Sequence, residues 1–202
     1  MLTHSELQKQ SVDAEDKMRS DLYGLLGRLL FAPPDQKLLT DLAAISGDDS
    51  DMGRAFSTTK RLASSIDLPS VVEEYEGLFI GMGRGELLPY ASYYLTGFLN
   101  EKPLAKLRNT MRDFGIAQND DVAEPEDHIG SLCEMMSGMI VGRYGDAATL
   151  AQQQDFFETH IQPWAGHFFS DLEAAELSRF YQPVGTIGRL FVEIEKDAFS
   201  MQ

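Results

Sequence analysis

Apolar residues recur along most of the chain with the spacing of amphipathic helices, and proline or glycine interrupts each run. In the clearest run the apolar positions follow i, i+3, i+4, i+7 and i+8, at Leu22, Leu25, Leu26, Leu29 and Leu30. Ala32-Pro33-Pro34 ends this run, because proline lacks a backbone N–H and restricts the residue before it. The pattern therefore predicts a helix that stops at these prolines.

The same reasoning predicts helices over most of the remaining chain. Pro125 suits the first position of its helix, whereas Pro183 is expected to kink or split the last one. We find no alternating strand pattern and no internal repeat. The predicted fold is all-α, with residues 1–202 in a single-domain bundle of roughly eight to ten helices joined by short loops. The expected helices after the first are 38–45, 51–66, about 70–79, 102–114, 125 to an end near 142–145, 147–161, one opening at Pro163-Trp164, and 175–199.

Two segments between these helices are expected to be loops. Residues 81–89 contain three alternate glycines and a proline, which a stable helix does not accommodate. This loop leads into an aromatic cluster at Tyr90, Tyr93 and Tyr94. Residues 116–124 are polar and acidic and are expected to form a long connection between helices.

Composition and charge narrow the class of protein. With 43% hydrophobic residues in 202, the chain can bury a sizeable core. No apolar run is long enough to span a bilayer, and residues 1–19 lack the apolar region of a signal peptide, so we expect a cytoplasmic protein without membrane insertion. The net charge of −15 argues against a nucleic-acid partner and would attract a basic peptide. Solubility alone explains the charge equally well.

The enzyme templates that we tested are missing from the sequence. It has no P-loop, no Glu-x-x-His pair for a di-iron bundle, no zinc-deaminase motif and no Gly-x-Ser-x-Gly elbow. Pro163 lies between His160 and His167, so packing or surface roles are favoured over a two-histidine metal site. The single cysteine, Cys133, lies on an apolar face and is interpreted as a buried hydrophobe. We therefore expect no catalytic residue, no metal site and no cofactor.

The most unusual local feature is Glu124-Pro125-Glu126-Asp127-His128. With Pro125 at the first helical position, Glu126 and Asp127 would lie in the first turn and offset the partial positive charge of the helix N-terminus. This capping role does not explain His128, because a cationic imidazole is unfavourable there. The neighbouring aspartate instead suggests a hydrogen-bonded or proton-sensitive pair of Asp127 with His128.

Four segments of the chain, in the same order and at compatible spacing, resemble the TorD/DmsD family of redox-enzyme maturation chaperones, to which the NarJ type is related. Residues 22–34 resemble the family's opening helix and its proline stop. Residues 75–81 followed by 88–94 resemble its aromatic, glycine-bearing loop. Glu124 to His128 matches its most specific motif, and His160-Ile161-Gln162-Pro163-Trp164 is similar to a later element that we interpret as structural.

The resemblance implies a chaperone rather than an enzyme. Family members bind the twin-arginine leader of a molybdenum-containing oxidoreductase in the cytoplasm and hold the apoenzyme until its molybdopterin cofactor is inserted. Such a site needs acidic groups beside an aromatic and apolar groove. Carried over onto this sequence, Asp127 and His128 are the polar contacts, and Glu124 and Glu126 add negative potential. The apolar part of the implied peptide site consists of Tyr75, Leu78, Phe79, Pro89 and Tyr90.

Several alternatives stay open at this stage. Close relatives of the DMSO reductase type have tryptophan at several aromatic positions where this chain has Tyr75, Tyr90 and Tyr94, so the client oxidoreductase is not specified. Core packing is the alternative role for these tyrosines. The alternative functions are a guanine-nucleotide-binding regulator that uses residues 81–85, and an interaction protein without leader preference. The family includes monomers and helix-exchanged dimers, and residues 116–124 are a candidate hinge for such exchange.

Overall fold

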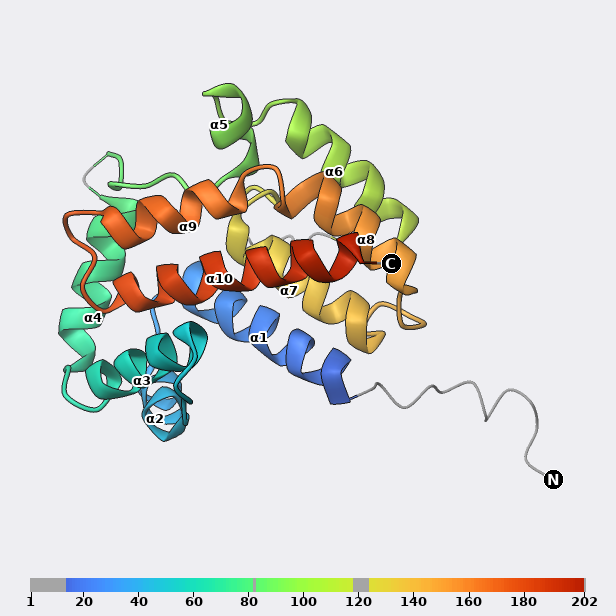
Figure 1. Ribbon diagram of the computed structural model, residues 1–202. Coiled ribbons are helices and arrows are strands. Elements are labelled where there is room, and N and C mark those ends of the chain that lie inside the picture. The colour runs from blue at the N-terminus through green and yellow to red at the C-terminus, as the bar shows by residue number, and fades with distance from the viewer. Residues whose placement is uncertain (1–13, 82, 118–123, 202) are drawn as a thin grey trace.

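The computed structural model describes residues 14–81, 83–117 and 124–201 (Figure 1). Within these ranges the chain forms ten α-helices and two π-helical segments and no β-strand, so the all-α prediction is confirmed. In chain order the elements are α1 (Ala14–Phe31), α2 (Gln36–Ala44), α3 (Asp51–Ala63), α4 (Leu68–Tyr75), η1 (Glu76–Ile80), α5 (Ala91–Thr96), α6 (Lys102–Asp113), α7 (Ile129–Val141), α8 (Leu150–Phe156), η2 (Phe157–Ile161), α9 (Ala165–Ala174) and α10 (Tyr181–Ser200).

Helices α1 and α7 pack against each other at the centre of the bundle, and α9 and α10 form a second packed pair (Figure 1). Helix α7 is apolar on nearly all sides, so it is stable only when it is buried. Gly27 of α1 lets the two backbones approach: a Cβ atom at this position would lie 2.8 Å from Cγ of Glu134 and 3.2 Å from the carbonyl oxygen of Gly130. The last residues of α1 therefore lie beside the first residues of α7.

A buried ion pair joins α1 to α10. Glu195 is 2% exposed and receives two hydrogen bonds from Arg19, from Nε at 2.7 Å and from Nη2 at 2.8 Å. The hydroxyl of Tyr23 donates a third at 3.0 Å, and Arg19 Nη1 also donates to Gln153 of α8 at 3.0 Å. Because both oxygens of the carboxylate accept hydrogen bonds from α1, this pair fixes the two long helices in one register.

Helix α10 begins at Tyr181, six residues later than the sequence predicted, and the expected kink at Pro183 is wrong. Pro183 lies in the first turn of α10, where a missing N–H leaves no intrahelical bond unmade. The carboxylate of Glu74, on α4, accepts hydrogen bonds from the backbone N–H groups of Arg179, Phe180 and Tyr181 at 2.8–3.0 Å. This carboxylate, which is distant in the sequence, therefore caps the start of α10.

Two further differences from the sequence prediction lie close to the candidate site. The helix expected from Pro125 begins at Ile129, so Glu126 and Asp127 precede the first turn. The short helix α5 was not expected at all. The other predicted helices are present with bounds shifted by a few residues, and Cys133 is buried on α7 as predicted. Most of the proposed hinge (118–123), Met82 of the glycine loop and the N-terminal residues 1–13 lie outside the described residues.

Candidate functional site

The two most specific motifs of the sequence meet in a short stretch of extended backbone. Tyr90 and His128 form an antiparallel bridge. The N–H of Ala91 donates to the carbonyl of Asp127 at 3.0 Å, and the N–H of Ile129 donates to the carbonyl of Pro89 at 2.8 Å. The segment that opens α5 and the segment that opens α7 are thereby held side by side, which brings together Pro89, Tyr90, Glu124, Asp127 and His128 of the predicted peptide site.

His128 caps the N-terminus of α7. Its Nδ1 atom accepts a hydrogen bond from the N–H of Gly130 at 3.0 Å, and its ring lies edge-on to Phe31 and Tyr90 at centroid distances of 5.7 and 5.3 Å. The residue is 4% exposed, and burial lowers the pKa of the imidazole to about 4. The ring is therefore neutral at pH 7 and acts as an acceptor, which removes the conflict between a cation and the helix dipole.

The side chain of Asp127 forms a hydrogen bond with the N-terminus of α5 rather than with its neighbour His128. Its Oδ2 atom accepts a hydrogen bond from the N–H of Ser92 in the first turn of α5, at 2.7 Å. In the described part of the chain, Asp127 and His128 do not form the expected hydrogen bond with each other, because each side chain bonds the N-terminus of a different helix. Asp127 is 1% exposed, and its Oδ1 atom has no partner among the described residues, an arrangement that lowers stability unless another group satisfies it.

The two glutamates of the motif differ in their surroundings. Glu126 is 6% exposed and forms a two-bond ion pair with Arg108 of α6, at 2.9 and 2.8 Å. Burial alone would raise the pKa of this carboxyl, but the bonds from Arg108 outweigh burial and hold the pKa below its usual value. Glu124 is exposed, and its carboxylate accepts a hydrogen bond from the neutral hydroxyl of Tyr90. Glu124 therefore presents at the surface a carboxylate that pairs with no cation among the described residues.

Of the remaining predicted apolar residues, Tyr75 and Leu78 are buried and Phe79 is partly exposed. Tyr75 is 4% exposed and its hydroxyl donates to the carbonyl of Leu30 at 3.2 Å; burial, with a smaller contribution from the charge of Glu124, raises the pKa of Tyr75 to about 12. Leu78 is fully buried. Phe79 is half-buried and lies edge-on to Tyr75 at 5.0 Å. Tyr75 and Leu78 therefore lie in the interior beneath the site, whereas Phe79, Tyr90 and Glu124 reach solvent. A direct peptide contact by any of the predicted residues stays a prediction.

An acidic cavity of about 300 Å³ lies beside the motif. Three acidic residues line it, Glu124, Glu126 and Glu134, and the rest of its wall is mainly apolar. Sequence reasoning missed most of this wall, because its members come from α1, α6 and α7 and no local pattern connects them. Such a cavity can accommodate an apolar side chain next to a cationic one. The other lining residues are Phe31, Met111, Ile116, Ala117, Ser131, Met135 and Tyr144.

His160 and Trp164 have the structural positions that the sequence favoured. The indole N–H of Trp164 donates to the carbonyl of His160 at 2.8 Å, and Nε2 of His160 is hydrogen-bonded to the hydroxyl of Thr110 at 2.9 Å. Tyr94 stacks on Trp164 at 5.3 Å and bonds Asp171 at 2.8 Å. Among the described residues no group of three histidine, cysteine or acidic side chains could hold a metal ion.

Comparison with known proteins places the chain in a family. A family model described as "Nitrate reductase delta subunit" matches residues 46–170, which include three of the four motif segments. The chain belongs to this family. No helix in the described part of the chain is long and apolar enough to cross a membrane.

Relatives of the chain are named as chaperones, which confirms the resemblance to the TorD/DmsD family. A DmsD-type Tat proofreading chaperone of Haemophilus influenzae is 28% identical over 82% of this chain and 84% of its own length. A TorD chaperone of Vibrio parahaemolyticus is 26% identical, with 58% of this chain and 59% of the relative covered. A crystal structure from Archaeoglobus fulgidus, described as a redox enzyme maturation protein, shares the fold with a TM-score of 0.57 at 23% identity, covering 87% of this chain and 94% of that one.

The family and the loop geometry both argue against the guanine-nucleotide alternative. The relatives named above are chaperones. Gly81 ends η1 with a φ of +58°, and a Cβ atom there would lie 2.0 Å from the carbonyl oxygen of Arg84, so glycine is required for the turn itself. The loop follows a π-helical segment rather than a strand, whereas a phosphate-binding loop follows a strand. The glycines of this loop therefore allow the chain to reverse direction.

Proposed function

We propose that this protein is a cytoplasmic chaperone that binds the twin-arginine leader of a molybdenum-containing oxidoreductase. It holds the apoenzyme until the molybdopterin cofactor is inserted and so delays export. Membership of the nitrate reductase delta subunit family and the names of the relatives support this proposal. The chaperone acts as a monomer or a helix-exchanged dimer and performs no catalysis of its own.

The observation that carries the proposal is the acidic cavity next to the paired motifs. A twin-arginine leader combines cations with an apolar stretch, and the cavity offers carboxylates beside methionine and aromatic side chains. The charge of Glu126 is balanced by Arg108, and Glu134 lies 3.9 Å from Arg143. Glu124 bonds only a neutral tyrosine hydroxyl among the described residues, so it is the carboxylate best placed to bind a guanidinium group.

The residues of the proposed site act in two groups. Tyr90, Phe79 and Glu124 reach solvent and meet the leader first. His128 is covered by the Tyr90 segment, and Asp127, which is 1% exposed, borders only the cavity between α5 and α6. The leader therefore contacts these two residues only when the Tyr90 segment moves aside. Flexible side chains such as those of Met111 and Met135 suit a wall that adapts to leaders of different sequence.

Isothermal titration calorimetry with synthetic leader peptides tests the proposal. The peptides are the leaders of the molybdoenzymes encoded in the same genome, each paired with a version in which both arginines are replaced by glutamine. We expect one leader to bind and its glutamine version to bind at least tenfold more weakly, since two charge-assisted contacts are lost. Equal binding of both versions indicates an interaction protein without leader preference. No binding of any leader at millimolar concentration refutes the proposal.

A further inference from the structure

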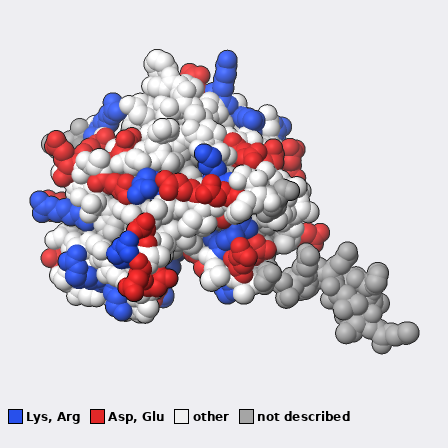
Figure 2. All heavy atoms as spheres, viewed as in Figure 1, with Lys and Arg blue, Asp and Glu red and all other residues white. Residues whose placement is uncertain are grey.

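Helix α5 and the turn after it expose a cluster of large apolar side chains, here called the apolar tip. Its members Leu95, Phe98 and Leu99 are 44%, 69% and 42% exposed. In Figure 2 the uppermost surface, over α5, is mainly white, and a few red atoms and then the blue side chains over α6 stand beside it. Exposed apolar residues gathered within five positions, on a chain of net charge −15, are typical of an interaction surface.

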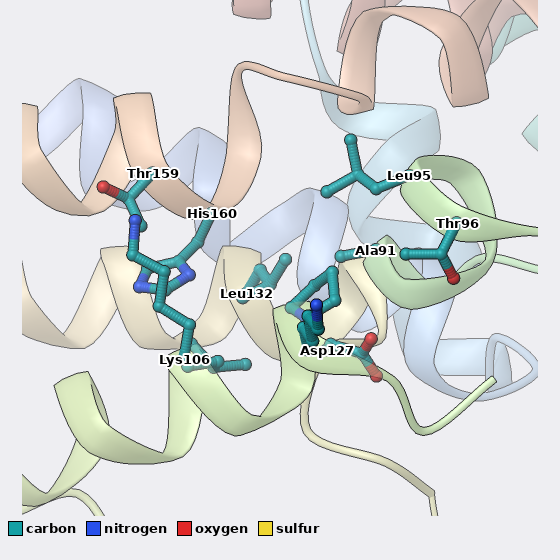
Figure 3. Close-up of a pocket in the computed structure, with 11 residues that line it drawn as sticks. Ala91, Leu95, Thr96, Lys106, Asp127, Leu132, Thr159 and His160 are labelled. Atoms are coloured by element: carbon teal, nitrogen blue, oxygen red, sulfur yellow. The ribbon is translucent and has the colours of Figure 1, made fainter. Parts of the chain in front are cut away.

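A cavity of about 290 Å³ continues inward from the apolar tip, between α5, α6, α7 and η2. Its wall is mainly apolar and includes Ala91, Leu95, Pro103, Leu107 and Leu132. Figure 3 shows Lys106 below Thr159 and His160 on one side of this cavity, and the α5 residues Leu95 and Thr96 on the other. The volume suits one or two bulky apolar side chains of a partner, because sites for drug-sized molecules are generally larger.

The rim of this cavity is positively charged, unlike most of the chain. Lys102 and Lys106 lie one turn apart on α6, both exposed, and neither ammonium forms an ion pair with any described residue. Burial, together with the nearby charge of Lys106, lowers the pKa of His160 to about 4, so His160 adds no charge at pH 7. Among the described residues that line the wall, Asp127 is the one acid, and its buried carboxylate accepts a hydrogen bond from the N–H of Ser92. Within the described part of the chain, the rim therefore carries two cations that no acidic side chain pairs.

We propose that the apolar tip and the lysine-rimmed cavity form a docking surface for an acidic amphipathic protein segment, which places bulky apolar side chains in the cavity and carboxylates on Lys102 and Lys106. The surface is distinct from the acidic cavity, which is lined by Glu124, Glu126 and Glu134. A twin-arginine leader is excluded as the occupant, because its cations would face the two lysines. The two cavities thus select partners of opposite charge.

Two synthetic helical peptides of about 18 residues provide the defined probes. One carries glutamates on one face and leucine and phenylalanine on the other, and its counterpart has lysine in place of every glutamate. Fluorescence anisotropy of the labelled peptides measures binding to the full chain. We expect the acidic peptide to bind at least tenfold more tightly than the basic one at the lysine-rimmed cavity, with affinity that falls as salt is added.

The charge-reversal variant K102E/K106E is expected to weaken binding of the acidic peptide about tenfold, since two exposed charge contacts become repulsive. The matched control R61E/K196E makes the same change in net charge at exposed cations of α3 and α10, and it separates local contacts from long-range attraction. Phe98→Ser, at a 69% exposed position, tests the apolar contact without disturbing the core and is expected to weaken binding at least threefold.

Three results would overturn this proposal. The first is equal binding of the acidic and basic peptides, or equal losses in K102E/K106E and R61E/K196E. The second is saturable binding to phosphatidylglycerol vesicles, abolished by Phe98→Ser, without binding of the acidic peptide, which would assign the surface to a membrane. The third is concentration-dependent dimerisation in analytical ultracentrifugation that Phe98→Ser abolishes, which would assign it to a second copy of the chain. Leader binding by the same variants is measured separately by calorimetry. A failure of leader binding therefore does not change how these three results are interpreted.

Discussion

Replacing His128 with asparagine should flatten the dependence of stability on pH. Burial sets the pKa of His128 at about 4 in the folded protein, against 6.5 in the unfolded chain. Because protonation favours the unfolded state, the stability is fully present above pH 6.5 and is lost as the pH falls toward 4. Between about pH 7.5 and about pH 5 these two values give a loss of about 2 kcal/mol from this one group.

Asparagine is chosen because it is among the best N-cap residues and does not titrate in this range. Urea unfolding followed by far-ultraviolet circular dichroism, at both pH values, gives the free energy of unfolding of each protein. We expect the wild type to lose about 2 kcal/mol more than His128→Asn on acidification. His160, whose pKa is also lowered to about 4, titrates in both proteins and cancels in this comparison.

The matched control is His167→Asn, because His167 is exposed on α9 and its ring stays in water in both states. This control is expected to keep the pH dependence of the wild type. If His128→Asn also keeps it, the neutral buried imidazole inferred here is wrong, and the role of His128 as an uncharged cap of α7 must be abandoned.

Further substitutions test other contacts of the structure. Glu124→Gln should weaken leader binding about tenfold in calorimetry and leave the melting temperature unchanged, because the removed charge is exposed; Glu73→Gln, at another exposed acid, should change neither. Glu195→Leu should lower the free energy of unfolding by about 3 kcal/mol in urea titration, since it leaves the largely buried Arg19 without its main partner; full stability would show that Asp16 and Gln153 satisfy Arg19 by themselves. Gly27→Ala should cost about 1–3 kcal/mol, because its Cβ would lie 2.8 Å from Glu134 Cγ and force α1 from α7; a stable variant with unchanged helix packing would contradict that close approach.

The helices that the sequence predicted well are those whose boundaries depend on nearby residues. The run from Leu22 to Leu30 buries one face, and the prolines at 33 and 34 stop it, so α1 could be predicted from a single window. The start of α10 could not, because the capping carboxylate of Glu74 lies 105–107 positions earlier in the chain. Helix α5 escaped prediction for the same reason: it has six residues, and its first turn is bonded by Asp127, 35 positions away.

The candidate site divides in the same way. The segments around Tyr90 and Glu124 to His128 were recognisable because each is a continuous motif. Their pairing, and the wall that Phe31, Met111 and Met135 add, depend on how α1, α6 and α7 pack. The predicted start of α7 at Pro125 was wrong because it assigned capping to the acids. The neutral imidazole of His128 caps the helix instead, which begins at Ile129, four residues after Pro125.

Each polar residue of the motif holds a different part of the fold, and this limits what mutations of the motif can prove. Glu126 is bonded to α6, Asp127 to α5, and His128 to α7. Removing Asp127 or His128 would therefore disturb the position of a helix N-terminus as well as any contact with a peptide, so weaker leader binding in such variants does not demonstrate contact. Glu124 is the exposed member of the set, and among the described residues it bonds only the side chain of Tyr90. Loss of leader binding in Glu124→Gln at unchanged stability is consequently the result that separates recognition of the leader from maintenance of the fold.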